Sequence, residues 1–168
     1  MKKLITVAAL AAASQVLASA SANWERTASP DAAVSVMTPC SKAEFQTDVE
    51  GAGFRLVCRK GGMIFIATSG MAGGSGKVAT FDEQLAGARE KLPSSEIDET
   101  PMFGHRALKI VCGGRDGVAC VEIIDWRPGS PLMVAAIEEG GPGTASAAEL
   151  PGILVRARSF YDSLEVAR

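Results

Sequence analysis

One stretch of this chain has the residue types of a phosphate-binding loop. The sequence SGMAGGSGKVATFDEQL (69–85) is a glycine-rich run that ends in a lysine and leads into an amphipathic segment. A loop of the form G-x-x-x-x-G-K-[ST] requires a first glycine and a final hydroxyl where this chain has Met71 and Val78. We therefore interpret residues 69–79 as a flexible, glycine-rich connection. The alternative is an anion held by free backbone amides and Lys77.

The chain shows no motif for nucleophilic catalysis. It contains neither G-x-S-x-G nor S-x-x-K, and His105 is its only histidine. His105 follows Gly104 at the start of an expected strand. We interpret it as an exposed strand-end residue rather than as the base of a triad assembled by folding. The sequence therefore predicts no catalytic residue.

Three pairs of adjacent acidic residues are candidates for the two carboxylates of a glycoside hydrolase. Neighbouring positions of a helix or strand point in different directions, so we interpret the three pairs as solvated surface charge. A single acidic residue, Asp116, lies in the glycine-rich turn at 113–117, which offers too few oxygen ligands for calcium. The pairs are Asp82 and Glu83, Asp98 and Glu99, and Glu138 and Glu139.

The four cysteines favour disulfides over a metal centre. No C-x-x-C spacing occurs and there is one histidine, so neither a zinc site nor a thioredoxin-type pair is indicated. Three pairings of four cysteines are possible. We predict Cys40–Cys58 and Cys112–Cys120, because each pair brackets one plausible chain reversal. We expect no metal and no cofactor.

The N-terminus has the three parts of a signal peptide. A basic start is followed by an apolar run, Leu4–Ala13, and by small residues up to Ala22. The apolar run is about half the length of a transmembrane helix. We expect residues 1–22 to be cleaved near Ala22, leaving residues 23–168 as one domain, periplasmic or secreted, without a stable membrane anchor. Thiols oxidise in that compartment.

The charge of the mature chain argues against nucleic acid as a partner. Cleavage would remove Lys2 and Lys3 and no acidic residue, leaving 15 basic and 19 acidic side chains and a net charge of −4. Proteins that bind nucleic acid concentrate lysine and arginine instead. We expect a monomer whose partner is an unknown protein or small molecule.

The first half of the domain reads mainly as strands. Alternation of apolar and polar residues predicts strands over 32–37 and 54–58, and a further strand is expected over 42–48. The glycine pair at 61–62 predicts a tight hairpin turn. Residues 63–67 are apolar on both faces and predict a central strand.

A helix follows over residues 81–92. Thr80 and Glu83 form a capping box, in which each side chain satisfies a backbone amide at the helix start. Apolar residues then recur at helical spacing until Pro93. Residues 94–104 show no periodicity, and we expect a loop there.

A second hairpin is expected around the turn at 113–117. Apolar residues alternate on both sides of this turn, and the two cysteines that flank it suggest the register. The predicted register sets Cys112 against Cys120, Ile110 against Glu122, Leu108 against Ile124, and Arg106 against Trp126, the last pair as a cation–π contact.

The chain ends with a strand over 132–137 and a helix that starts near Leu150, with Pro151 in its first turn. Apolar residues form one stripe along this helix. The order of elements predicts an α+β domain: an antiparallel sheet of about five to six strands with two main helices packed on it.

This element order resembles the PsbP-type domain, an α/β/α sandwich of extrinsic photosynthetic subunits and of small uncharacterised exported proteins of alphaproteobacteria. The resemblance rests on the strand before Pro39, the hairpin at 61–62, the helix at 81–92, two later strands, and the closing helix that ends SFYDSL (159–164). It implies a non-enzymatic binding or assembly role. The four cysteines depart from the photosynthetic members, so a role in oxygen evolution is not implied.

The leading hypothesis is an exported, disulfide-stabilised binding or interaction module without catalytic activity. One alternative is a secreted hydrolase with residues gathered from distant loops. A pocket that holds His105 near a serine and an acid would support this alternative. The other is an inhibitor of a secreted hydrolase, presenting the 69–79 loop or the 113–119 turn.

Overall fold

Two antiparallel sheets and two helices make up the fold. The computed structural model describes residues 23–41, 43–47, 53–70, 79–112 and 118–167; the expected signal peptide lies outside them. In these residues one sheet has the strand order β1-β2-β9 and the other β3-β4-β8-β7-β6-β5. The elements are β1 (Glu25–Ala28), β2 (Val34–Thr38), β3 (Phe54–Lys60), β4 (Met63–Ser69), α2 (Phe81–Lys91), β5 (Glu96–Met102), β6 (His105–Val111), β7 (Val121–Ile124), β8 (Leu132–Glu138), α3 (Leu150–Asp162) and β9 (Glu165–Val166).

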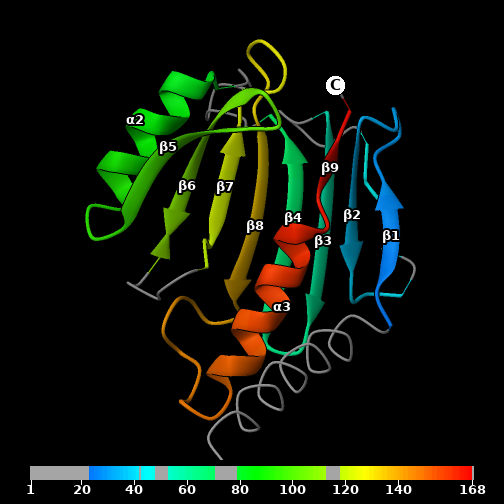
Figure 1. Cartoon of the computed structure of the whole chain (residues 1–168), viewed down its shortest axis with the longest axis vertical. Coiled ribbons are helices and arrows are strands. Elements are labelled where there is room, and N and C mark those ends of the chain that lie inside the picture. The colour runs from blue at the N-terminus through cyan, green and yellow to red at the C-terminus, as the bar shows by residue number, and fades with distance from the viewer. Residues whose placement is uncertain (1–22, 42, 48–52, 71–78, 113–117, 168) are drawn as a thin grey trace, which may run out of the picture.

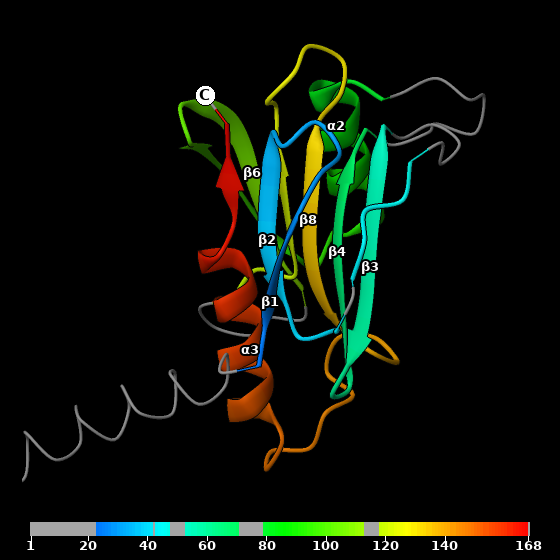
Figure 2. The same ribbon diagram turned by 90° about the vertical axis from the view of Figure 1, so that its right-hand side faces the viewer.

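The elements form three layers with the six-stranded sheet in the middle (Figures 1 and 2). Helix α3 and the small sheet cover one face, where Phe160 and Val36 pack with Phe65. Helix α2 packs on the other face, where its Leu85 contacts the cluster around Ile110. Both faces of the large sheet therefore carry apolar side chains.

The α+β class with antiparallel strands and two helices is confirmed, but the prediction of a single sheet is wrong. The strand expected at 32–37 is β2, which pairs with β1 and β9 instead of joining the large sheet. Strand β1 is polar and exposed and β9 has two residues, so neither has a periodic signal. At the expected strand 42–48, the described residues form one bridge, between Gln46 and Arg55.

The β3–β4 hairpin confirms the glycine turn. Lys60 pairs with Met63, which leaves a two-residue loop in which Gly61 and Gly62 have φ values of +61° and +73°. This is the conformation that a two-residue hairpin favours and that glycine adopts without a steric cost. Arg156 of α3 donates a hydrogen bond of 2.9 Å to the Gly61 carbonyl, which ties the turn to the helix. As expected, β4 is flanked by strands on both sides.

Helix α2 begins at the predicted capping box. The Glu83 amide donates to the Thr80 hydroxyl at 3.3 Å, and the Thr80 amide donates to the Glu83 carboxylate at 2.7 Å. Gly87 lies in the middle of the helix, where glycine costs about 0.5–1 kcal/mol relative to alanine. A β-carbon at Gly87 would meet no atom of the described residues within 4 Å, so packing does not require this glycine.

The loop expected over 94–104 is wrong, because these residues contain strand β5. It pairs with β6 along seven positions, from Glu96 opposite Val111 to Met102 opposite His105. β5 is an edge strand and most of its side chains are exposed, which explains the missing alternation. Pro101 is tolerated because one side of an edge strand needs no backbone donor.

The predicted register of the β6–β7 hairpin is wrong by one residue. Lys109, not Ile110, lies opposite Glu122, and Leu108 lies opposite Ile123. Strand β7 carries apolar residues on both faces, so alternation alone could not fix the register. The observed register joins a base to an acid on one face and apolar residues on the other.

The expected contact of Arg106 with Trp126 is also wrong. The Arg106 guanidinium lies over the Phe81 ring at 4.5 Å, and Arg127 lies over Trp126 at 3.9 Å. With the shifted register, Trp126 belongs to the core on the α3 side of the sheet, while Arg106 reaches toward α2 and binds Asp82 and Glu99 at 3.0 Å.

Helix α3 begins at Leu150 with proline in its first turn, as predicted. The side chain of Glu149 accepts hydrogen bonds from the Ser146 amide and hydroxyl, at 3.0 and 2.6 Å, one turn before the helix. The apolar stripe of α3, formed by Ile153, Ala157 and Phe160, is buried against the sheet. The helix therefore crosses the sheet over β8 and β4 (Figure 1).

The turn between β1 and β2 is held by one carboxylate. The Ser29 hydroxyl donates to Asp31 at 2.6 Å, the Ala33 amide donates at 3.2 Å, and Arg127 forms an ion pair with it. The Ser29 hydrogen bond is the largest influence on Asp31 and, with Arg127, it outweighs partial burial and lowers the pKa to about 2. Asp31 thus ties the small sheet to the segment after β7.

We expect Asp31→Asn to destabilise the protein at neutral pH by no more than about 1 kcal/mol, because the ion pair is exposed. The folded-state pKa is below the unfolded value of 3.8, so the contribution of the carboxylate is present above pH 3.8 and lost as the pH falls toward about 2. Urea unfolding of both proteins across this range measures the difference. A difference that stays constant with pH would contradict the prediction.

Candidate functional site

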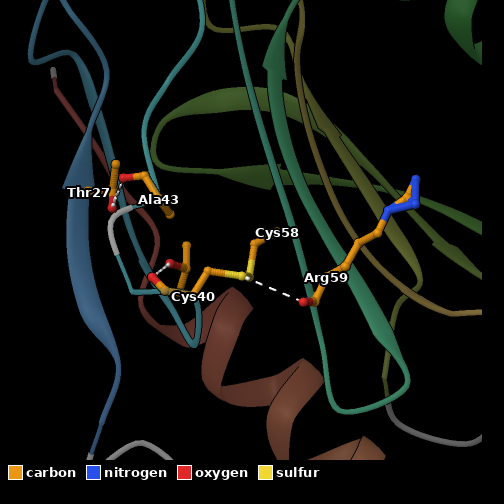
Figure 3. Close-up of a disulfide and its surroundings, with 6 residues drawn as sticks. Thr27, Cys40, Ala43, Cys58 and Arg59 are labelled. Carbon is orange, nitrogen blue, oxygen red and sulfur yellow. Dashed lines mark hydrogen bonds between the residues drawn. A yellow bond between two sulfur atoms is a disulfide. The ribbon is translucent and has the colours of Figure 1, made fainter.

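The two disulfides hold the sheet at separate places. The structure pairs the cysteines as predicted, Cys40 with Cys58 and Cys112 with Cys120, with Cα separations of 5.9 and 5.6 Å. Figure 3 shows Cys40, in the segment after β2, reaching Cys58 on β3, so this bond joins the small sheet to the large one. The Thr27 hydroxyl donates to the Ala43 carbonyl at 3.1 Å and fixes the same segment. The second disulfide joins the ends of β6 and β7.

A small cavity lies between this second hairpin and α3. Its volume is about 100 Å³, roughly the share of three water molecules in the liquid. Two basic and two acidic side chains line it, Lys109 and Arg158 with Glu122 and Asp162, together with Tyr161. The charged groups come from β6, β7 and the last turns of α3, so the cavity exists only when the helix packs on the hairpin.

Glu122 is the unusual residue of this cavity. It is 6% exposed, yet its carboxylate accepts no hydrogen bond from any residue that the structure describes. Burial raises the pKa of Glu122, Asp162 adds to the rise, and the charge of Lys109 opposes it. A largely buried carboxylate that faces a cavity without a protein donor favours a group in that cavity, water or solute, that donates hydrogen bonds.

Tyr161 supplies a hydroxyl donor beside the Glu122 acceptor in this cavity. Its hydroxyl oxygen accepts the Ala136 amide at 2.9 Å, which leaves its proton available to donate. Burial raises the pKa of Tyr161 well above its usual value, so the phenol stays protonated. Val118 and Ala119 line both this cavity and an apolar one of about 40 Å³ beside the Cys112–Cys120 bond.

We expect Glu122→Gln to stabilise the protein at pH 7 and to change it little near pH 4. Glu122 has a folded-state pKa above its unfolded value of 4.5, so its contribution to stability is full below pH 4.5 and is lost as the pH rises through the folded value. Glutamine has no charge to bury, so the variant keeps this stability at pH 7. Urea unfolding at the two pH values tests this, with the exposed Glu139→Gln as the matched control. Equal effects of both substitutions would contradict the burial argument.

The other residues with the chemistry for a site lie elsewhere. His105 is the first residue of β6, half-buried opposite Met102, and it lines neither the Glu122 cavity nor the apolar cavity beside it. Of the glycine-rich run, residues 71–78 lie outside the described residues, as do Asp116 and the tip of the 113–119 turn. The described residues contain no group of three or more histidine, cysteine, aspartate or glutamate side chains placed to hold a metal.

The interpretation of the acidic pairs as surface charge is wrong for Glu138. This residue is 8% exposed, and its carboxylate accepts the Thr144 and Ala145 amides at 3.0 and 3.4 Å. It therefore fixes the segment between β8 and α3. Asp82, Glu83, Asp98, Glu99 and Glu139 are exposed.

Sequence reasoning missed Glu122 as a site residue. The signal that could have found it was a glutamate inside the apolar run of β7, at a position opposite a lysine in the correct register. The one-residue error in register hid this pairing, because it placed Glu122 opposite Ile110.

Comparisons with known proteins add no further assignment: no family model, curated protein or solved structure matches this chain. Within the described residues, none of the helices has the length and apolar character needed to cross a membrane.

Proposed function

We propose that this chain is an exported, disulfide-stabilised binding module that takes up a small zwitterionic solute at Glu122. The observation that carries the proposal is the largely buried Glu122 carboxylate, which faces a cavity lined by two basic and two acidic side chains and receives no hydrogen bond from the described residues. The ammonium group of such a solute would donate hydrogen bonds to Glu122 and Asp162, and its carboxylate would form an ion pair with Lys109. The volume limits the bound group to a few heavy atoms.

Export is part of the same proposal. Residues 1–22 have the pattern of a cleaved leader, and two disulfides are typical of proteins that fold in an oxidising compartment. Mass spectrometry of protein purified from the periplasm should give a chain that starts near residue 23 and carries no free thiol. An uncleaved chain with four thiols would overturn this part.

A distant relationship to the PsbP-type domain is also proposed. It rests on the order of strands and helices and on the helices that lie on opposite faces of one sheet, and it agrees with a non-enzymatic role. The three-stranded sheet β1-β2-β9, which lies with α3 on one face of the large sheet, is not part of this resemblance.

Binding is tested by titrating isotope-labelled mature protein with glycine, methylammonium and acetate while recording amide shifts. We expect glycine to shift amides of β7 and the end of α3 at lower concentration than either half-ligand. Glu122→Gln should weaken the response to glycine and methylammonium more than the response to acetate, while Glu139→Gln should change neither. Absence of saturable shifts with all three solutes would overturn the proposed ligand class.

A further inference from the structure

A groove separates α2 from part of the large sheet, on the face opposite Glu122. Its volume is about 400 Å³, within the range of about 300–1,000 Å³ that is usual for small-molecule sites. Its floor contains Ile110, Val121, Ile123 and Met133, and the helix contributes Gly87 and Lys91 to its wall. The floor is thus apolar and the wall carries a cation.

The floor belongs to an apolar row that crosses all six strands. Successive partners in this row are Ile97, Ile110, Val121, Ala135, Ile66 and Val57. The buried residues of α2 pack against one end of this surface, in the cluster with Ile110 and Ile123. At the other end Val57 is 45% exposed. In the described residues, α2 therefore covers only part of an apolar sheet face.

Gly87 keeps the groove open. Glycine inside a helix costs about 0.5–1 kcal/mol relative to alanine, and a β-carbon here would meet no atom of the described residues within 4 Å. The substitution of alanine would favour the helix and would narrow the groove. What the glycine provides at this position is space.

The two ends of the groove differ in charge. At the N-terminal end of α2, the Glu83 carboxylate is held by the amide and hydroxyl of Thr80. At the other end, Lys91 is exposed and forms no ion pair with any described residue. An amphiphile with an anionic head therefore has one favourable orientation, with its head at Lys91.

The strands of the floor also restrict the occupant. β6, β7 and β8 are interior strands whose backbone groups pair within the sheet, so they offer no free edge to an extended peptide. An acyl chain needs no backbone partner and matches a floor of branched apolar side chains.

We propose that the groove between α2 and the sheet binds a free medium-chain fatty acid, with its carboxylate at Lys91 and its chain over Ile110, Val121 and Met133. Binding is non-covalent. This site lies on the opposite face of the sheet from Glu122, so the inference does not depend on the function proposed above.

Isothermal titration of the mature protein with decanoate, below its micellar concentration, tests the proposal. We expect saturable one-to-one binding. Gly87→Phe should weaken it by about tenfold or more by filling the groove, and Gly87→Leu serves as a second variant that also favours the helix. Ala86→Phe places the same ring on the exposed side of α2 and should leave the affinity within about twofold.

The head group is tested separately. Lys91→Gln should weaken binding of decanoate by about tenfold and leave binding of decan-1-ol unchanged, because the alcohol lacks the charge. No saturable binding of decanoate, unchanged affinity in folded Gly87→Phe and Gly87→Leu, or unchanged affinity in Lys91→Gln would each overturn the proposal. Glu122→Gln should bind decanoate normally, which separates this result from the glycine experiment.

Discussion

Replacing Phe65 by alanine is expected to lower the free energy of unfolding by about 3–5 kcal/mol. Phe65 is fully buried in β4, in the middle layer of the fold. Its ring contacts Trp24 at a centroid distance of 5.5 Å and Phe160 of α3 at 5.1 Å. Alanine would remove the side chain at which the large sheet, α3 and the segment before β1 meet, and the surrounding backbone is held by two sheets that limit collapse into the space.

Urea unfolding at pH 7, followed by far-ultraviolet circular dichroism, measures this effect. Phe103→Ala is the matched control, because Phe103 is 42% exposed at the tip of the β5–β6 turn. The control should change stability by no more than about 0.5 kcal/mol. If the two variants lost similar stability, the three-layer core would not depend on Phe65 in the way the packing indicates.

Local chemistry accounts for the elements that the sequence predicted well. The capping box of Thr80 and Glu83 and the glycine pair at 61–62 act within a few residues, so their signal does not depend on the rest of the fold. The same holds for Pro151, whose ring restricts where α3 can begin. These features are confirmed because no distant contact competes with them.

Strand β5 and the β6–β7 register depended on partners that the local pattern does not specify. Glu96–Met102 is polar and becomes a strand because the exposed edge of β6 is available to it. The β6–β7 register follows from covering the sheet on both sides, since Val121 and Ile123 face α2 while Ile124 faces α3's layer. Alternation predicts one buried face, and here there are two.

The candidate site was predictable only in part. The cysteine pairing followed from the chain reversals that the residues around it indicate. The sequence analysis interpreted Glu138 as surface charge and did not single out Glu122, because the burial of both is created by α3 and by the segment before it, far away in the sequence. The groove at Gly87 has no motif at all, since it arises where a helix covers a sheet incompletely.

Replacing Cys40 and Cys58 together by alanine is expected to cost about 3 kcal/mol of stability. The bond closes a loop with a sequence separation of 18, and the restriction of the unfolded chain grows slowly with that separation. It is also the covalent link between the segment after β2 and the edge strand β3, so its loss should loosen the small sheet first. Replacing both residues avoids leaving one reactive thiol.

Urea unfolding of the double variant measures the loss of stability, and hydrogen exchange shows whether the small sheet loosens first. The matched control replaces Cys112 and Cys120, whose separation of 8 predicts a smaller cost of about 2.5 kcal/mol. Amides of β1 and β2 should exchange faster in the Cys40/Cys58 variant. In the control, the amides of β6 and β7 should exchange faster instead. Because the two bonds lie at separate places in the fold, the location of the faster exchange distinguishes a local staple from a uniform loss of stability. Uniformly faster exchange in both variants would show that neither bond holds a separate part of the fold.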